Sequence, residues 1–330
     1  MRSWAVELLL ALSAAAPACA AERLSGYGAD VSAFTVSGVS SGGYMAVQMH
    51  VAHSSRIHGA AALAAGPYYC ARGSLWTAWG TCMTGAPAVS RAAAEQYARD
   101  GKVDPPANLA KARVWLFSGT QDRTVVPAVV EALARQYGLF GTKPALVRDR
   151  PAGHAMVTAN AGAACSATEP PFINDCDYDA AGELLRHLLG ALSTPSGEPG
   201  GRVVRFDQRE FGGTHAISMA QEGYAYVPRS CESGRCRVHV AFHGCRQGAE
   251  AIDERFVREA GYNGWADTNR LIVLYPQAVA RYLGWTFNPR GCWDWWGYTG
   301  RDYATKDAPQ IRAVVGMVER LGLSSKESKR

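Results

Sequence analysis

The chain has 330 residues, 48% of them hydrophobic, and carries a formal net charge of +5. This size and composition suffice for a substantial core in one large domain or in two small ones. The lysines and arginines are dispersed rather than clustered, so nucleic acid is not expected as a partner.

The first twenty residues have the pattern of a secretory signal peptide. Arg2 precedes an apolar run that includes 8–12, and Ala18-Cys19-Ala20 forms a small-x-small cleavage site. The run is too short to span a bilayer, so no stable membrane insertion is expected. A lipoprotein anchored at Cys19 is the alternative, but the residues before it match the usual lipoprotein motif poorly. We predict removal of 1–20 and a secreted protein, either extracellular or periplasmic.

A Gly-x-Ser-x-Gly motif follows, as Gly38-Val39-Ser40-Ser41-Gly42. A β-prone run at 33–36 precedes it, and a helix-like run at 44–49 comes after it. Strand, sharp turn and helix together make up the nucleophile elbow of α/β-hydrolases. A simple Gly/Ser-rich connecting loop is the alternative, because the motif alone also occurs by chance. In the elbow interpretation Ser40 is the nucleophile and Ser41 acts through its backbone N–H.

Strands and helices alternate after this motif. Strands are predicted at 57–65, 114–117 and 145–147, and helices at 88–99, 127–137 and 178–192. This alternation predicts an α/β fold with a mostly parallel sheet and helices on both faces.

Asp122 and His154 each follow one of the predicted strands, where parallel sheets place their functional residues. The order Ser, Asp, His along the chain is that of α/β-hydrolase triads. A helix cap for Asp122 and an ordinary exposed loop position for His154 are the alternatives. We predict that Ser40, His154 and Asp122 act as nucleophile, base and orienting acid.

The second half begins with a linker-like segment, 193–201, rich in Ser, Pro and Gly. Beyond it the sequence predicts strands at 203–206, 223–227, 238–242 and 271–275, helices at 250–267 and 307–323, and a polar tail at 324–330.

The place of the second oxyanion donor along the chain indicates that the order of the elements is altered. In α/β-hydrolases it normally comes from a His-Gly-x loop before the nucleophile. Here the loop His243-Gly244-Cys245 comes late in the chain. We predict a circular permutation, in which 193–201 joins the ordinary ends of one catalytic domain over 21–323. Two domains, 22–192 and 202–330, are the alternative, but neither would hold a complete site.

Eight cysteines remain after removal of the signal peptide, and an even number in an exported protein favours disulfides. Many pairings are possible. The spacing favours three disulfides that close short loops, Cys70–Cys82, Cys165–Cys176 and Cys231–Cys236, and the two remaining cysteines form the fourth pair, Cys245–Cys292.

No metal or organic cofactor is predicted. The sequence has no Cys-x-x-Cys pair. His239 and His243 lie along one predicted strand, roughly 13 Å apart, which is too far to share an ion.

These residues resemble the extracellular poly(3-hydroxybutyrate) depolymerases of the single-domain, circularly permuted type known from a fungus. The resemblance covers nearly the whole mature chain. Beyond the residues already named, it rests on Gly66-Pro67-Tyr68, Cys176-Asp177-Tyr178-Asp179, Gly261-Tyr262-Asn263, Trp265-Ala266-Asp267-Thr268-Asn269 and Gly291-Cys292-Trp293-Asp294-Trp295.

The resemblance implies the same triad, with the N–H groups of Ser41 and Cys245 as the oxyanion hole. It also implies that Trp295 lines the subsite for a monomer unit beside the cleavage point, and it agrees with the proposed cysteine pairs. The segments 78–87 and 280–288 depart from the family's pattern, which leaves the polymer preference open.

An aromatic cluster comprises Trp285, Trp293, Trp295, Trp296 and Tyr298. We assign Trp293 to the core. Trp296 and Tyr298 belong either to the core or to an exposed edge that contacts a polyester chain.

We therefore expect a monomeric serine esterase that cleaves poly(3-hydroxybutyrate) or its oligomers. An esterase for acetylated xylan or feruloyl esters is one alternative, since relatives of the fold share these motifs. A non-catalytic polymer-binding protein is the other.

Overall fold

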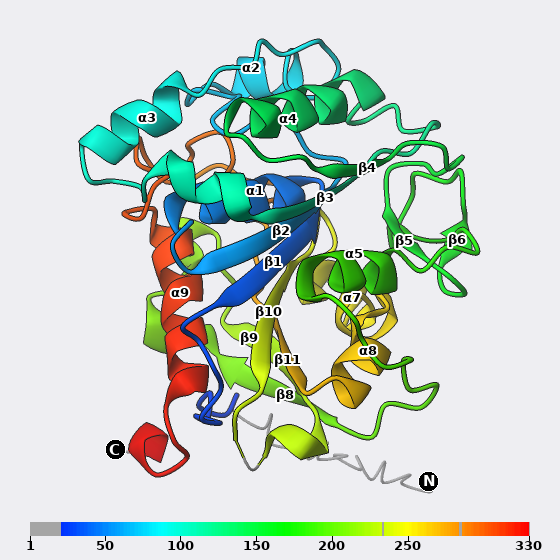
Figure 1. Cartoon of the computed structure of the whole chain (residues 1–330), viewed down its shortest axis with the longest axis vertical. Coiled ribbons are helices and arrows are strands. Elements are labelled where there is room, and N and C mark those ends of the chain that lie inside the picture. The colour runs from blue at the N-terminus through cyan, green and yellow to red at the C-terminus, as the bar shows by residue number, and fades with distance from the viewer. Residues whose placement is uncertain (1–20, 233, 284–285, 330) are drawn as a thin grey trace, which may run out of the picture.

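The computed structural model describes residues 21–232, 234–283 and 286–329. The predicted signal peptide at 1–20 and Trp285 lie outside the described residues. Within them, an eight-stranded sheet with the order β4-β3-β2-β1-β10-β11-β9-β8 runs through the molecule (Figure 1). Its strands are β1 (Phe34–Val39), β2 (Ile57–Leu63), β3 (Arg113–Phe117), β4 (Ala145–Val147), β8 (Arg202–Asp207), β9 (Glu222–Val227), β10 (Arg237–Phe242) and β11 (Leu271–Tyr275).

The sheet joins the two halves of the chain. β1 from the first half pairs in parallel with β10 from the second, and Val36 lies opposite Val240. Only β9 runs antiparallel to its neighbours β8 and β11. If the strands are counted from β8 onward, the spatial order becomes 1-2-4-3-5-6-7-8. This is the strand order of an α/β-hydrolase, so the fold is the circularly permuted one that the sequence predicts.

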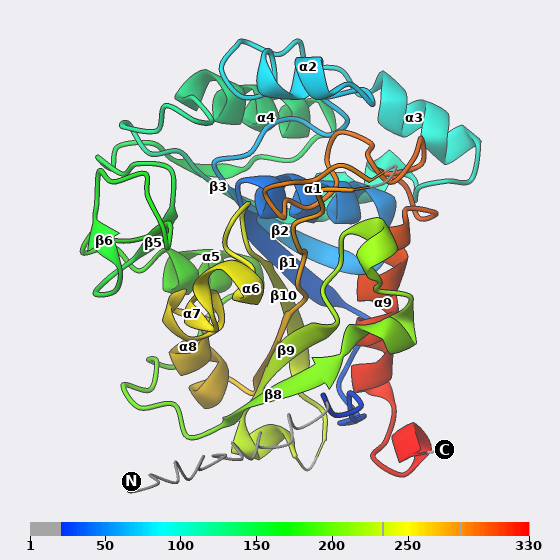
Figure 2. The ribbon, with the colours of Figure 1, turned by 180° about the vertical axis from the view of Figure 1, so that it is seen from behind.

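Helices cover both faces of the sheet, because alternate side chains of each buried strand point to opposite faces. On β3, Val114 and Leu116 pack towards α4 (Pro127–Leu139), whereas Trp115 and Phe117 pack towards α5 (Ala180–Leu189). One face carries α1 (Ser41–Ala52), α4 (Pro127–Leu139) and α9 (Pro309–Gly322), and the other carries α5 (Ala180–Leu189), α7 (Arg255–Glu259) and α8 (Tyr262–Thr268) (Figures 1 and 2).

All twelve residues of α1 are buried. The helix lies in the interior, between the sheet and the surrounding loops, which explains why 44–49 carries no polar face. Two further helices, α2 (Leu75–Trp79) and α3 (Ala92–Arg99), lie outside it. α2 belongs to the segment that the Cys70–Cys82 disulfide closes.

The single helix predicted over 250–267 is wrong. The structure has three short helices there: α6 (Ala249–Ile252), α7 and α8. Asp253 has a φ of 54° and Gly261 a φ of 90°. A residue in this left-handed region ends a right-handed helix, so the chain turns at both points.

The linker-like segment 193–201 is held along α8. Ser193 N–H donates to Asn269 Oδ1 over 2.7 Å, and Ser196 N–H donates to Gly264 O over 3.0 Å. Gly201 N–H donates to Asp267 Oδ1 over 3.0 Å. This segment is therefore an ordered connection between α5 and β8.

Candidate active site

The nucleophile elbow forms where β1 meets α1. Ser40 lies between them with φ 56° and ψ −126°, a backbone conformation that costs energy for any residue with a side chain. A Cβ on Gly38 would overlap the backbone of Gly42, and one on Gly42 would overlap the carbonyl of His243. Both glycines of the motif are therefore required by close approach of the backbone.

Ser40, His154 and Asp122 form one hydrogen-bonded chain. The distance from Ser40 Oγ to His154 Nε2 is 2.8 Å, and that from His154 Nδ1 to Asp122 Oδ2 is also 2.8 Å. A carboxylate can only accept, so Nδ1 carries the proton and Nε2 accepts from the Ser40 hydroxyl. His154 is 8% exposed and Asp122 1% exposed. The arrangement can take the proton from a serine as it attacks a carbonyl.

Asp122 also orders its own turn. Its Oδ1 accepts hydrogen bonds from Thr124 N–H over 2.8 Å and Val125 N–H over 2.9 Å. The carboxylate therefore caps the chain before α4 with one oxygen and holds the imidazole with the other.

The loops that carry Asp122 and His154 are bonded to each other. Gln121 N–H donates to Ala152 O over 3.1 Å, and a Cβ on Gly119 would overlap that same carbonyl. Gly153 N–H donates to Cys165 O over 2.8 Å. This last contact comes from a small second sheet that the sequence did not predict: β5 (Met156–Thr158), β7 (Ile173–Asp175) and β6 (Ala163–Ala164).

The two predicted oxyanion donors lie beside Ser40. Ser41 begins α1, where the first N–H groups of a helix have no partner in the preceding turn. Cys245 follows Gly244, and a Cβ on Gly244 would lie 3.2 Å from the Cβ of Ser40. Across the part of the chain that the structure describes, neither Ser41 N–H nor Cys245 N–H donates to a protein group. Both remain available to a bound oxyanion.

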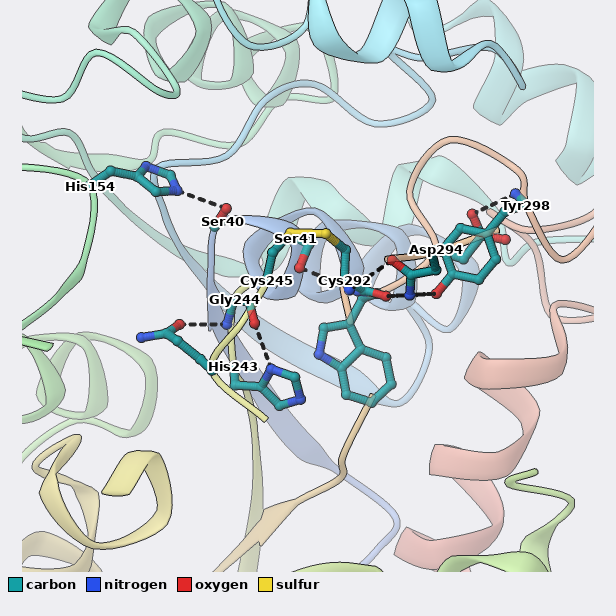
Figure 3. Close-up of a disulfide and its surroundings, with 12 residues drawn as sticks. Ser40, Ser41, His154, His243, Gly244, Cys245, Cys292, Asp294 and Tyr298 are labelled. Atoms are coloured by element: carbon teal, nitrogen blue, oxygen red, sulfur yellow. Dashed lines mark hydrogen bonds between the residues drawn. A yellow bond between two sulfur atoms is a disulfide. The ribbon is translucent and has the colours of Figure 1, made fainter. Parts of the chain in front are cut away.

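The Cys245–Cys292 disulfide ties the His-Gly-Cys loop to the loop that begins at Cys292 (Figure 3). Trp293 N–H donates to Ser41 Oγ over 3.2 Å, so this second loop also contacts the elbow. The four disulfides join the cysteines in the pairs that the spacing favoured: Cys70–Cys82, Cys165–Cys176, Cys231–Cys236 and Cys245–Cys292.

A cavity of about 270 Å³ opens at Ser40. Its walls mix apolar and charged side chains, including Met83, Phe172 and Arg290, and they include His154. The volume lies near the lower end of small-molecule pockets, roughly 300–1,000 Å³, so the cavity suits a short acyl segment.

The aromatic residues Trp293, Trp295, Trp296 and Tyr298 are not among those that line this cavity. Trp295 is 5% exposed and stacks on Tyr44 with ring centroids 4.1 Å apart, and it is not among the residues that line the cavity. Trp293 is fully buried, as the core assignment requires. Trp296 is 8% exposed, and the Tyr298 hydroxyl donates to Cys292 O over 2.7 Å.

Other apolar side chains are exposed instead. Trp76 is 83% exposed on α2, and the chain then leads to Met83 in the cavity wall. Leu283 is 81% exposed and precedes Arg290, another residue of that wall. The remaining large exposed apolar residues of these two segments are Trp79, Tyr282 and Phe287. Trp79 lies within 78–87, and Tyr282, Leu283 and Phe287 lie within 280–288, the two segments that depart from the family's pattern, whereas Trp76 precedes the first of them.

Two residues beside the site escaped the sequence analysis. Gln247 Oε1 accepts from Gly244 N–H over 2.7 Å, and His243, known from the sequence only as the first residue of the His-Gly-Cys loop and as a rejected metal ligand, has a hydrogen bond to Gly244 O. The only feature of the sequence that could have indicated these two residues is their position within and just after the His-Gly-Cys motif. Among the described residues, no cluster of three or more His, Cys, Asp or Glu could hold a metal ion.

No helix in the described ranges is long and apolar enough to cross a membrane.

The sequence is similar to a known family model and to proteins of known activity. The sequence model of the prolyl oligopeptidase family matches residues 18–177, which include Ser40, Asp122 and His154. A poly(3-hydroxybutyrate) depolymerase of Delftia acidovorans is 40% identical over 97% of this chain. The chain spans 66% of that relative's length. A polyhydroxybutyrate depolymerase of Talaromyces funiculosus is 38% identical over 95% of this chain and 96% of the relative.

Two solved structures of similar proteins have the same fold as this chain. The crystal structure of PHB depolymerase from Penicillium funiculosum superposes with a TM-score of 0.85, at 35% identity, and covers 91% of this chain and 98% of that one. A PHB depolymerase with a serine-to-alanine substitution, complexed with an R3HB trimer, gives the same TM-score at 36% identity and the same coverage.

Proposed function

The chain belongs to the poly(3-hydroxybutyrate) depolymerase family, and on this basis we propose that it is a secreted serine esterase that hydrolyses poly(3-hydroxybutyrate) or its oligomers. The observation that carries the proposal is the hydrogen-bonded chain of Ser40, His154 and Asp122 at the mouth of the cavity. Four disulfides support an exported protein, because such bonds persist in oxidising compartments.

Acylation follows from the geometry. Ser40 Oγ attacks the ester carbonyl while His154 Nε2 takes its proton, and Asp122 stabilises the imidazolium. The N–H groups of Ser41 and Cys245 stabilise the oxyanion of the tetrahedral intermediate. The ester C–O bond then breaks, and the leaving alkoxide receives the proton from His154.

Deacylation repeats these steps with water. A water molecule attacks the acyl-enzyme while His154 takes a proton from it. His154 then returns that proton to Ser40 when the hydroxyacid leaves. No cofactor enters either half-reaction.

The exposed apolar residues next to the cavity suit a solid polyester. Trp76 and Trp79 on one segment, and Tyr282, Leu283 and Phe287 on the other, offer apolar area to an aliphatic surface. We propose a monomer, in which one copy contributes every residue of the site.

A substrate panel tests the proposal. The wild type and Ser40→Ala would be given a polymer suspension, the linear trimer and dimer, and acetylated xylan. We expect the wild type to clear the polymer or to cleave its oligomers, and Ser40→Ala to lose this activity by at least about 1,000-fold. Release of acetate from xylan without any polyester hydrolysis would instead identify a carbohydrate esterase.

A further inference from the structure

His243 is a buried histidine with two defined hydrogen bonds. It is 0% exposed, directly follows β10, and packs near the rings of Phe256 and Trp293. Its Nε2 lies 3.0 Å from Ala278 N, and its Nδ1 lies 2.6 Å from Gly244 O. The Ala278 amide can only donate, so Nε2 accepts and Nδ1–H donates to Gly244 O.

The ring therefore stays in one neutral tautomer. Burial lowers the pKa of His243 to about 4, so it remains uncharged at neutral pH. A neutral imidazole with a fixed tautomer acts as a rigid donor at a defined position.

The carbonyl that His243 holds belongs to the same peptide group as Cys245 N–H. In a planar trans peptide the C=O and the N–H point in opposite directions. Fixing Gly244 O at His243 therefore turns Cys245 N–H away from that histidine. Figure 3 shows His243 and Ser40 on opposite sides of this loop, so the N–H is turned to the side on which Ser40 lies.

The neighbouring contacts hold other parts of the loop. Gln247 Oε1 accepts from Gly244 N–H over 2.7 Å, and Gln247 Nε2 donates to Phe172 O over 2.7 Å. The disulfide to Cys292 holds the side chain of Cys245. Gly244 O, the peptide oxygen that sets the direction of Cys245 N–H, accepts from His243 Nδ1 over 2.6 Å and, over a longer 3.3 Å, from the backbone N–H of Gln247. Among the described residues, His243 is thus the one side chain that bonds to this oxygen.

We infer that His243 is a positioning residue, whose Nδ1–H aims the Cys245 N–H at the oxyanion formed during ester hydrolysis. The inference rests on the proposed function, because it assigns a task within that reaction. An oxyanion donor acts only when it is correctly placed, and a displacement of about 1 Å can cost roughly 100-fold in rate.

Two substitutions of His243 each remove one of the two hydrogen bonds that its ring makes and keep the other. The amide of His243→Asn occupies the position of Nδ1, so it can donate to Gly244 O but cannot reach Ala278 N–H. The amide of His243→Gln occupies the position of Nε2, so its oxygen can accept from Ala278 N–H but the bond to Gly244 O is lost. Each variant thus keeps one partner.

The experiment measures kcat and KM with p-nitrophenyl butyrate for the wild type, Ser40→Ala and both His243 variants. Near-UV circular dichroism would measure the fraction of folded protein in each sample, and kcat would be calculated from that fraction. Thermal unfolding would be recorded in parallel. We expect kcat of His243→Gln to fall about 10- to 100-fold with KM within about twofold of the wild type. We expect His243→Asn to retain kcat within about threefold, although its melting temperature falls because Ala278 N–H loses its partner.

Other outcomes overturn the inference. A folded His243→Gln with the kcat of the wild type would contradict it, as would parallel losses of activity and stability in both variants. If His243→Gln does not fold, His243→Leu takes its place, since Leu and Asn both lack the bond to Ala278 and differ in the donor to Gly244 O. Absence of Ser40-dependent hydrolysis in the wild type would overturn the proposed function itself, and with it this inference.

Discussion

Asp122 shows how one side chain serves both the local fold and the proposed reaction. Its Oδ1 is occupied by two backbone N–H groups, and its Oδ2 faces His154 Nδ1. The carboxylate cannot rotate without breaking bonds to Thr124 and Val125. The imidazole is therefore oriented by a group whose own orientation is fixed by the turn.

Replacement of Asp122 by Asn tests this arrangement. The amide can keep its oxygen on the Thr124 and Val125 N–H groups, which places its NH₂ towards His154 Nδ1. That favours the tautomer with the proton on Nε2, which cannot accept from Ser40, so kcat should fall by about 1,000- to 10,000-fold. Esterase kinetics and thermal unfolding would be measured together.

Asp179 offers a control carboxylate outside the site. It accepts from Gly182 N–H at the start of α5 and from Trp265 Nε1 over 2.7 Å. Asp179→Asn should change stability but leave kcat close to the wild type. Equal losses of activity in Asp122→Asn and Asp179→Asn would show that the effect is only structural.

The buried histidine His239 predicts a pH dependence of stability. Its ring nitrogens bond to Thr35 Oγ1 and Ser37 Oγ, each over 2.7 Å, and burial lowers its pKa to about 3. In the unfolded chain the pKa is about 6.5. Between these values the unfolded state binds the additional proton, so the free energy of unfolding falls as the pH decreases from about 6.5 towards 3.

Urea unfolding at a series of pH values measures this effect. His239→Gln should lower the slope of unfolding free energy against pH by up to about 1.4 kcal/mol per unit within that window. The comparison uses slopes, so an overall loss of stability in the variant does not matter. Identical slopes for the two proteins would contradict a neutral buried His239.

Among the site residues, those with a fixed place relative to a predicted strand were the ones that sequence reasoning could locate. Ser40, Asp122 and His154 each follow a strand, and parallel strands bring their carboxyl ends to one edge. Trp295 had no such constraint, and its packing against Tyr44 depends on a loop whose course the sequence does not specify. The role inferred for His243 depends on which atoms face Gly244 and Ala278, which no sequence pattern encodes.

At the scale of elements, the long buried strands and the amphipathic helices other than the one expected over 250–267 lie within a few residues of their predicted ranges. α9 was predicted at 307–323 and occupies Pro309–Gly322. The strands of the small second sheet were missed, because segments of two or three residues such as β6 and β7 show no alternation. β4, also three residues long, was predicted at 145–147. The Cys165–Cys176 disulfide and the contact with Gly153 give this small sheet its place beside His154.

α2 is the element most open to a test of substrate preference. Trp76 and Trp79 expose apolar area that no other part of the described chain covers. Replacing both with Ser should lower the ratio of polymer hydrolysis to p-nitrophenyl butyrate hydrolysis by about 5- to 50-fold, because the loss of apolar contact weakens binding to a solid surface. Turbidity clearing and a pellet-binding assay would measure it.

The matched control for this test is Leu139→Ser. Leu139 is also exposed, at 44%, but lies at the end of α4 and is not part of either apolar segment. An unchanged ratio in the double Trp variant, or an equal decrease in Leu139→Ser, would exclude a specific contribution of α2.

At the scale of the whole molecule, permutation moves the His-Gly-Cys loop to the other side of the connection at 193–201 without changing its place in space. β10 still lies next to β1, so Gly244 still approaches Ser40. We propose that 193–201, which hydrogen bonds hold along α8, is the connection that joins the ordinary ends of the fold. The sheet order thus preserves the site although the order along the chain has changed.

The central claim is that Ser40 forms a covalent intermediate with help from His154. The most direct measurement is peptide-mapping mass spectrometry of protein treated with a fluorophosphonate, with polyester hydrolysis followed in the same sample. We predict one adduct, located on Ser40, formed in step with the loss of hydrolysis and absent from Ser40→Ala. An adduct on another residue, or full hydrolysis by a protein quantitatively labelled at Ser40, would contradict the account.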